Sequence, residues 1–201
     1  MNLRELFFYK KKKWYHATSL NKFYKIMDEG ILFNVNEGKP LDFGSGFYLS
    51  PSKKWARGYA ENFFEIVDDD SDDSSAVIIE FRFMPINLIK EGMTHHFFKA
   101  QDLDYARFTV QNWLNPGKYN MKKDIIAGPM TDGNQLEMLA LHDKGIVSEA
   151  DLISVFIEET GENQLLLHTQ RACDAIRPYR ATTLKGDDLD VTTYKKNQAH
   201  T

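Results

Sequence analysis

The side chains best suited to chemistry are one histidine and two tyrosines in the first third of the chain. His16 is followed by two hydroxyl groups, Thr18 and Ser19, and an imidazole both donates and accepts hydrogen bonds at neutral pH. Tyr48 and Tyr59 offer aromatic faces, which attract a positively charged ring. The same residue types also suit ordinary packing, since a tyrosine tolerates one buried side and one wet end. They therefore leave two interpretations open, a binding site and a well-packed sheet.

The common catalytic templates are missing from the sequence. It contains no phosphate-binding P-loop and no GxSxG, and Gly44 and Gly46 precede a predicted strand, whereas the glycines of a Rossmann unit follow one. His95 and His96 are adjacent, without the spacing or the cysteine partners of a zinc site, so we expect no metal site. Cys173 lies in a predicted amphipathic helix, where we expect it to pack.

Four segments carry a family resemblance when they are taken in order. They read YHATS at residues 15–19, DFGSGFYLS at 42–50, DIIAGP at 124–129 and QLLLHT at 164–169. This order resembles the diphtheria-toxin and poly(ADP-ribose)-polymerase branch of the ADP-ribosyltransferase superfamily, in particular a little-characterised bacterial family whose members read YHGS, DFGxGFYLT, DIVxGP and QIxFxT. The resemblance covers about residues 13–178. It implies an α+β, ADP-ribosyltransferase-like fold in which two small antiparallel sheets, flanked by helices, form an NAD cleft.

The resemblance also implies that NAD is bound as a co-substrate, without a metal. In such a site the histidine ring bonds the adenosine ribose, the two tyrosine rings enclose the nicotinamide, and glycines let the backbone approach the nicotinamide amide. The residues expected to contact NAD are His16, Ala17, Thr18, Ser19, Phe43, Gly44, Gly46, Phe47, Tyr48 and Tyr59.

Gln164 departs from the superfamily pattern, and with Tyr48 and His16 it completes the expected catalytic set. The superfamily places a glutamate at the start of this strand, where a carboxylate stabilises the positive charge that develops on the ribose. Glutamine still hydrogen-bonds a ribose hydroxyl, but it has no charge and does not act as a base. Two interpretations stay open: a catalytic glutamine assisted in part by Glu162, the nearest carboxylate in the sequence, or a solvated residue at a strand start.

The function implied by the resemblance is mono-ADP-ribosyl transfer from NAD to a macromolecular acceptor, which is RNA, DNA or protein. Small intracellular transferases of this kind are often toxins of bacterial toxin–antitoxin or antiviral phage-defence systems, so an antitoxin protein is an expected partner. Three alternatives remain: a catalytically weak module that binds NAD or ADP-ribose, an NAD glycohydrolase that uses water as acceptor, and an interaction domain without a ligand.

Composition sets outer limits on these hypotheses. The chain has 201 residues, of which 42% are hydrophobic and 13% aromatic, enough for one domain with a real core. No apolar run approaches the roughly 20 residues that span a bilayer, so we expect no membrane partner, and a single cysteine suits a reducing cytoplasm. The net charge of −4 gives no general attraction to nucleic acid. Local exceptions are the four lysines at residues 10–13 and the group of Tyr105, Arg107 and Trp113, which suits base stacking or a packed helix.

The hydrophobic pattern predicts the elements that must position these side chains. We expect helices at residues 20–30, 51–66, 103–113, 148–159 and 170–176, and strands at 46–50, 75–83, 124–129 and 165–169, besides the strand that carries His16. Their irregular alternation favours an α+β fold over a doubly wound sheet. The acidic run at residues 68–73 predicts an exposed loop. Residues 1–180 are expected to form a single domain and residues 181–201 a polar, flexible tail.

Overall fold

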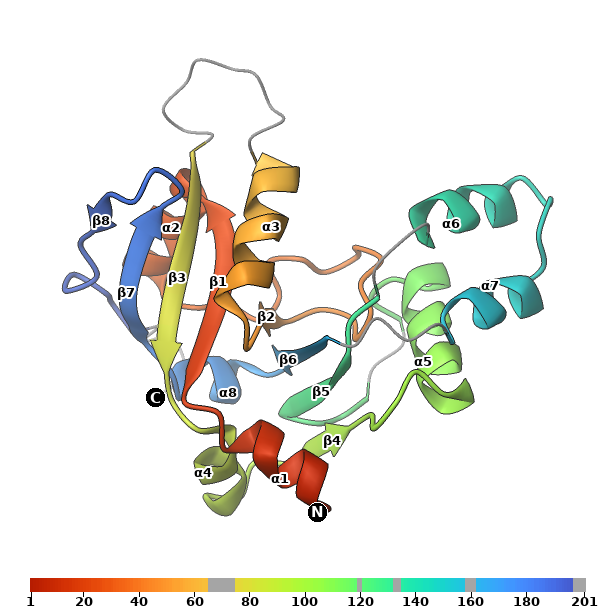
Figure 1. The fold of residues 1–201 in the computed structure, drawn as a ribbon, viewed down its shortest axis with the longest axis horizontal. Helices are drawn as coiled ribbons and strands as arrows, with labels where there is room; N and C mark the ends of the chain where they lie inside the picture. Colours follow the sequence, from red (N-terminus) through yellow and green to blue (C-terminus); the bar gives the residue numbers. More distant parts are fainter. Residues whose placement is uncertain (65–74, 119–120, 132–134, 158–161, 197–201) are drawn as a thin grey trace.

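The computed structural model describes residues 1–64, 75–118, 121–131, 135–157 and 162–196. Its helices are α1 (Leu3–Tyr9), α2 (Leu20–Glu29), α3 (Lys53–Phe64), α4 (Pro85–Lys90), α5 (Leu103–Leu114), α6 (Gln135–Asp143), α7 (Glu149–Val155) and α8 (Gln170–Asp174). Its strands are β1 (Lys13–Ser19), β2 (Phe47–Leu49), β3 (Ala76–Arg82), β4 (His95–Phe97), β5 (Ile125–Pro129), β6 (Asn163–Leu167), β7 (Pro178–Thr183) and β8 (Asp188–Leu189). Figure 1 shows two sheets flanked by helices, with α6 and α7 extending to one side. The predicted α+β class is confirmed.

The first sheet has the strand order β1-β3-β7-β8, and all its neighbouring strands are antiparallel. Successive residues of a strand point to opposite sides, so each strand serves two faces. One face packs through Tyr15 against Ala56 and Ala60 of α3. The opposite face carries Trp14 and Ile79 into the main core. His16 alternates with Tyr15, so its side chain lies on the core face.

The second sheet has the order β2-β6-β5-β4 and is mixed. β2, β6 and β5 are antiparallel, whereas β4 runs parallel to β5, with His95 opposite Ile125 and Phe97 opposite Ala127. The expectation of two antiparallel sheets is therefore correct for the first sheet and wrong for the second. The reason is the crossover through α5, because a parallel neighbour needs a connection of a dozen or more residues.

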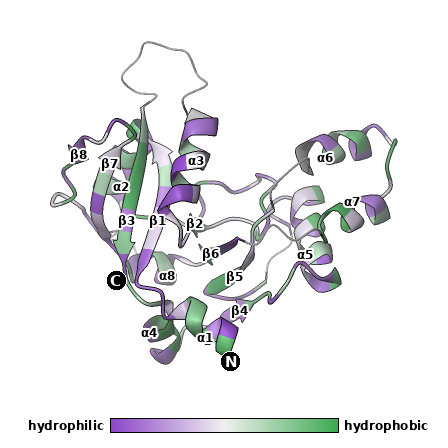
Figure 2. Ribbon diagram, in the orientation of Figure 1, coloured by the Kyte–Doolittle hydropathy of each residue, from purple (hydrophilic) through white to green (hydrophobic). Residues whose placement is uncertain are grey.

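The two sheets meet where β1 passes the end of β2. The backbone nitrogens of Tyr15 and Ser50 each donate to the other residue's carbonyl oxygen at 2.8 Å. Side chains from both sheets share the main core, among them Trp14, Phe47 and Leu165. Figure 2 shows β3 and β5 as strongly hydrophobic, as expected of strands buried within the fold. This junction brings β1, which carries His16, alongside β2, which follows the loop at residues 42–46.

The helix ends follow local sequence signals. α2 ends at Gly30, whose φ of 82° lies in the left-handed region that favours glycine. α7 begins with a capping box in which Ser148 and Asp151 bond each other's backbone nitrogens. The predicted helices at residues 20–30, 103–113 and 170–176 are confirmed, whereas α7 ends at Val155, before the predicted end. In the described ranges, no helix is long and apolar enough to cross a membrane.

The segment after residue 180 differs from the flexible tail expected from its polarity. Residues up to Thr183 complete β7, and β8 pairs beside it. Leu189, Val191 and Tyr194 pack against the main core. A few apolar side chains are enough to hold this segment, because β7 already pairs with β3 and delivers them to the core. Residues 197–201 and the predicted acidic loop at 68–73 lie outside the described residues.

Candidate functional site

The three predicted catalytic residues are connected through the loop at residues 42–44. The Nδ1 atom of His16 lies 2.8 Å from the carbonyl oxygen of Tyr48. The Tyr48 hydroxyl donates to the carbonyl oxygen of Gly44 at 2.7 Å. The Gln164 amide nitrogen donates to Asp42 Oδ2 at 2.6 Å. β1, β2 and β6 thus contribute one side chain each to a single network, which we call the loop-42 network.

His16 is held as a neutral imidazole with a defined tautomer. Its half-buried ring stacks on Phe47, with centroids 4.2 Å apart and planes 28° from parallel. Burial lowers the pKa of His16 to about 4, and the hydrogen bond to Tyr48 opposes this only in part. Because a carbonyl oxygen only accepts, we assign the proton to Nδ1. Nε2 is then the nitrogen of His16 whose lone pair is available to accept a hydrogen bond.

The Tyr48 hydroxyl is hydrogen-bonded to the loop at residues 42–44, so only its ring is available for other contacts. The hydroxyl donates to Gly44 and also accepts from the backbone nitrogen of Phe43 at 3.1 Å. Burial, together with the nearby charge of Asp42, raises the pKa of Tyr48 well above 10, so the phenol stays protonated. Its ring lies nearly parallel to that of Phe43, with centroids 6.5 Å apart. A chemical role for Tyr48 therefore rests on its aromatic face.

Gly46 is required by the packing of the second sheet. Its φ is 151°, and a Cβ atom there would lie 2.7 Å from the carbonyl oxygen of Leu167 and would also clash with the side chain of Leu166. The Asn36 side chain bonds both backbone polar atoms of Gly46 at 2.9 Å each. That the loop at residues 42–46 approaches a ligand amide closely remains a prediction. At Gly46 a glycine is required because a larger residue would clash with β6.

Gln164 is buried, with 7% of its surface exposed, which contradicts the interpretation as a solvated residue. Its amide nitrogen also lies 3.4 Å from the Pro129 carbonyl oxygen. A carboxylate and a carbonyl only accept, so the nitrogen must face them. The Gln164 Oε1 atom is consequently the one left to accept a hydroxyl hydrogen bond from a ligand.

Asp42 is the site residue that the sequence analysis missed. It is 7% exposed, and besides Gln164 it accepts hydrogen bonds from Trp113 Nε1 at 3.2 Å, Thr131 Oγ1 at 2.6 Å and the Thr131 backbone nitrogen at 3.0 Å. The carboxylate that contacts Gln164 is thus Asp42, whereas Glu162 was the one expected from the sequence. The available signal was an acidic residue opening an otherwise apolar and glycine-rich motif.

The other predicted NAD contacts divide into core and half-exposed residues. Thr18, Phe43 and Phe47 are buried, with 2%, 1% and 4% of their surface exposed. In this structure they pack beneath the site. Gly44 and Gly46 are buried as well, and the half-buried predicted residues are His16, Ala17, Ser19 and Tyr48. Ala17 packs towards α3, and Tyr59, which is 50% exposed, lies on α3 itself. The loop-42 network therefore joins His16, Tyr48, Phe43, Gly44 and Gln164, while Tyr59 belongs to the opposite face of the first sheet.

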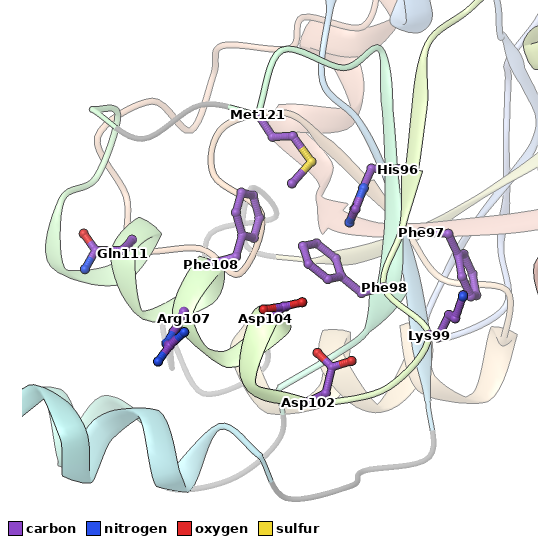
Figure 3. A pocket seen from close by; sticks show the side chains of 10 residues that line it. All are labelled: His96, Phe97, Phe98, Lys99, Asp102, Asp104, Arg107, Phe108, Gln111 and Met121. Atoms are coloured by element: carbon purple, nitrogen blue, oxygen red, sulfur yellow. The ribbon is translucent and has the colours of Figure 1, made fainter.

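A hollow of about 530 Å³ lies between β4 and α5 and contains none of the predicted NAD contacts. Figure 3 shows its lining residues, which are His96, Phe97, Phe98, Lys99, Asp102, Asp104, Arg107, Phe108, Gln111 and Met121. Phe43 links the loop-42 network to this hollow, because its ring is nearly parallel to that of Tyr48 and also to that of Phe98, whose centroid lies 5.7 Å away. Among the described residues no group of three or more histidine, cysteine or acidic side chains is arranged to hold a metal ion.

Residues 15–177 match the family model described as "Protein of unknown function (DUF3990)". The match spans most of the chain, including the loop-42 network and the hollow, so the protein belongs to this family. No curated protein and no solved structure matches the chain.

Proposed function

We propose that the protein is a mono-ADP-ribosyltransferase that takes ADP-ribose from NAD and transfers it to a macromolecular acceptor. The observation that carries the proposal is the loop-42 network, in which His16, Tyr48 and Gln164 are joined although they lie far apart in the sequence. The order of the four motifs supports the same assignment of the NAD-binding strands.

In the proposed reaction, the bond between the nicotinamide nitrogen and the ribose carbon breaks, and its electron pair goes to nicotinamide, which leaves as a neutral molecule. The positive charge passes to the ribose. A nucleophile of the acceptor then bonds to that carbon and loses a proton. Because the leaving group of NAD is already cationic, the chain contributes mainly positioning and electrostatic stabilisation.

The tautomer of His16 and the orientation of Gln164 give each a defined task in this proposal. His16 Nε2 accepts a hydrogen bond from a hydroxyl of the adenosine ribose, while Nδ1 stays bonded to β2. Gln164 Oε1 accepts from a hydroxyl of the nicotinamide ribose, while its nitrogen stays bonded to Asp42. The Tyr48 ring offers an aromatic face to the cationic nicotinamide.

Asp42 supplies the negative charge that position 164 lacks. Its buried carboxylate lies one hydrogen bond behind the Gln164 amide. A charge in a poorly polarisable interior acts more strongly than the same charge in water. It therefore polarises the amide, makes Oε1 a better acceptor, and favours positive charge on a ribose bound there.

The proposal is tested with labelled NAD, purified protein and a cell lysate, resolving the label on protein, RNA and DNA separately. The matched variant is His16→Asn, whose shorter amide keeps a donor for the Tyr48 carbonyl but removes the Nε2 acceptor. Lys25→Asn, at an exposed position of α2, is the control. We expect label on one macromolecular class with wild type and Lys25→Asn, and a loss of at least about tenfold with His16→Asn. Label that is equal in all three proteins, or absent from all, contradicts the proposal.

A second candidate function is an NAD- or ADP-ribose-binding module without turnover. The observation that favours it is that Gln164 is uncharged and its amide nitrogen is already bonded within the protein. This module would raise its melting temperature with NAD, by mass action, and would leave NAD intact. Cleavage of NAD without any acceptor would instead indicate a glycohydrolase.

The proposal also includes a toxin role, an antitoxin partner and a cytoplasmic location. These three rest on the family resemblance alone. Induced expression in a bacterium tests the toxin role. We expect growth arrest with wild type and normal growth with His16→Asn at equal protein levels. Normal growth with both proteins contradicts the toxin role.

A further inference from the structure

The hollow between β4 and α5 has an aromatic floor. The rings of Phe98 and Phe108 lie 5.1 Å apart with planes 36° from parallel, and the His96 ring meets Phe98 edge-on at 4.4 Å. Figure 3 shows Met121, His96, Phe98 and Phe108 pointing toward one another around the same space. Its volume of about 530 Å³ falls within the roughly 300–1,000 Å³ typical of small-molecule sites. The floor and its size therefore fit a flat, ring-shaped ligand.

Two exposed cations lie at the rim of the hollow. Lys99 and Arg107 line it and are exposed, and no ion pair among the described residues uses either of them. Lys122 and Lys123 directly follow Met121, and the charge of Lys123 acts on the ring of His96. Lys99 and Arg107 are thus the cations that line the hollow, in a chain whose net charge is −4.

Two acidic side chains lie at the same rim. Asp102 caps α5, where its Oδ1 accepts from the Tyr105 backbone nitrogen at 3.0 Å, and Asp104 lies in the first turn of the same helix. Gln111, which also lines the hollow, donates to the carboxylate of Glu149 at 2.9 Å. The anionic group that suits this rim is therefore one that bonds Lys99 and Arg107 directly, since no ion pair among the described residues engages them.

His96 is the imidazole side chain in the wall of the hollow. Burial, together with the charges of Lys123 and His95, lowers the pKa of His96, so its imidazole is neutral at neutral pH. A neutral imidazole donates through one nitrogen and accepts through the other. This pairing matches the mixed donor and acceptor edge that a nucleobase presents.

We propose that this hollow binds one nucleotide of a single-stranded nucleic acid, with the base against His96 and the aromatic floor and the phosphate at Arg107 and Lys99. Aromatic surfaces beside a basic edge are the combination by which proteins hold single strands. As a site for the acceptor, this inference rests on the proposed transferase function. As a nucleotide-binding site, it stands on the geometry alone.

The position of the hollow suits an acceptor that is longer than one nucleotide. The ring of Phe43 is nearly parallel to those of Tyr48 and Phe98, with planes 19° and 21° apart. Phe98 lines the hollow and Tyr48 does not, so a base held in the hollow is not the base that receives ADP-ribose. The hollow selects a neighbouring nucleotide, and the strand continues toward the loop-42 network.

The test measures binding of fluorescein-labelled single-stranded DNA and RNA oligonucleotides by fluorescence anisotropy, without NAD, over a range of salt concentrations. Arg107→Ala removes a phosphate contact, so affinity falls and the slope of log affinity against log salt decreases by about one. His96→Ala removes a base contact, so affinity falls by about tenfold while the slope is unchanged. Lys25→Ala removes the same charge from the exposed face of α2 and is expected to behave as wild type. A circular dichroism melt verifies that each variant is folded.

Each outcome decides the proposal. Binding that Arg107→Ala and His96→Ala weaken in these two distinct ways supports it, and no binding by any oligonucleotide overturns it. Binding that all variants share equally also overturns it, because the site then lies elsewhere. Label from NAD found on protein, with no oligonucleotide binding, overturns this inference and leaves the transferase standing. Binding at the hollow without any use of NAD supports the inference and contradicts the transferase.

Discussion

The side-chain nitrogen of Gln164 lies 2.6 Å from Oδ2 of Asp42, although 122 residues separate the two in the chain. The contact joins the loop before β2 to β6 and buries both side chains. Thr131 and Trp113 donate to the same carboxylate, so Asp42 holds four segments together while keeping its charge close to Gln164. The pair is both a structural link and the electrostatic centre of the proposed site.

Replacing Asp42 separates the effect of charge from that of shape. Asp42→Asn keeps the side-chain volume but removes the negative charge and presents an amide hydrogen where donors now point. We expect turnover of NAD to fall by about tenfold or more with little change in KM, and stability to fall by about 1–3 kcal/mol. Steady-state kinetics and urea unfolding measure the two effects. Asp143→Asn, at an exposed position, removes the same charge and is the control; equal turnover in the two variants contradicts a role for Asp42.

Exchanging the two side chains provides a stricter test of their pairing. Gln164→Glu alone places two carboxylates in contact inside the protein, so we expect lower stability and lower turnover at neutral pH. Adding Asp42→Asn restores one carboxylate and one amide, now with the charge at position 164. We expect the double variant to recover stability and turnover beyond the sum of the single effects. Simple additivity in the double-mutant cycle would show that the residues act independently.

Gly46→Ala tests whether the glycine loop is fixed by β6. The added methyl group meets the backbone oxygen of Leu167, which has little room to move. We expect a loss of about 1–3 kcal/mol in the free energy of unfolding. Gly58→Ala on α3 is the matched control, because nothing lies within 4 Å of the new methyl and alanine is the better helix former. An equal stability for the two variants would refute the packing argument.

Stability is expected to depend on pH through His16. Its pKa of about 4 in the folded protein lies below the ordinary value of 6.5, so between these values the unfolded chain binds a proton that the folded chain does not. The contribution of His16 to stability is therefore complete above about pH 6.5 and is lost as the pH falls towards 4. His16→Asn keeps the bond to Tyr48 but does not titrate, so its stability should vary less over this range. Urea unfolding at several pH values measures the difference, and parallel curves for both proteins would contradict the assignment.

The strands and helices of the motifs could be predicted because their signals are local. β-branched and aromatic runs predict β3 and β5, and a 3.6-residue period with Gly30 at its end predicts α2. β4 and β8 escaped prediction because they are three and two residues long and gain their strand conformation from neighbours. β7 and the segment around Tyr194 read as polar, and their docking depends on pairing with β3.

The candidate site could be predicted only in part, for a similar reason. Motif order predicts His16, Tyr48 and Gln164, since each lies on a recognisable strand. The contact of Asp42 with Gln164 depends on the pairing of β2 with β6, which brings the loop before β2 to β6, and no local pattern encodes that pairing. Phe43 was expected among the NAD contacts, and the structure buries it in an aromatic cluster, a setting that aromatic residues suit equally well.

The most direct test of the central claim is release of nicotinamide from NAD, followed by chromatography with purified wild type and His16→Asn in the presence of a single-stranded oligonucleotide or a lysate. The account predicts that wild type releases nicotinamide in step with labelling of the acceptor, and that His16→Asn releases at least about tenfold less. Intact NAD with the wild-type protein, at every acceptor supplied, would contradict the account.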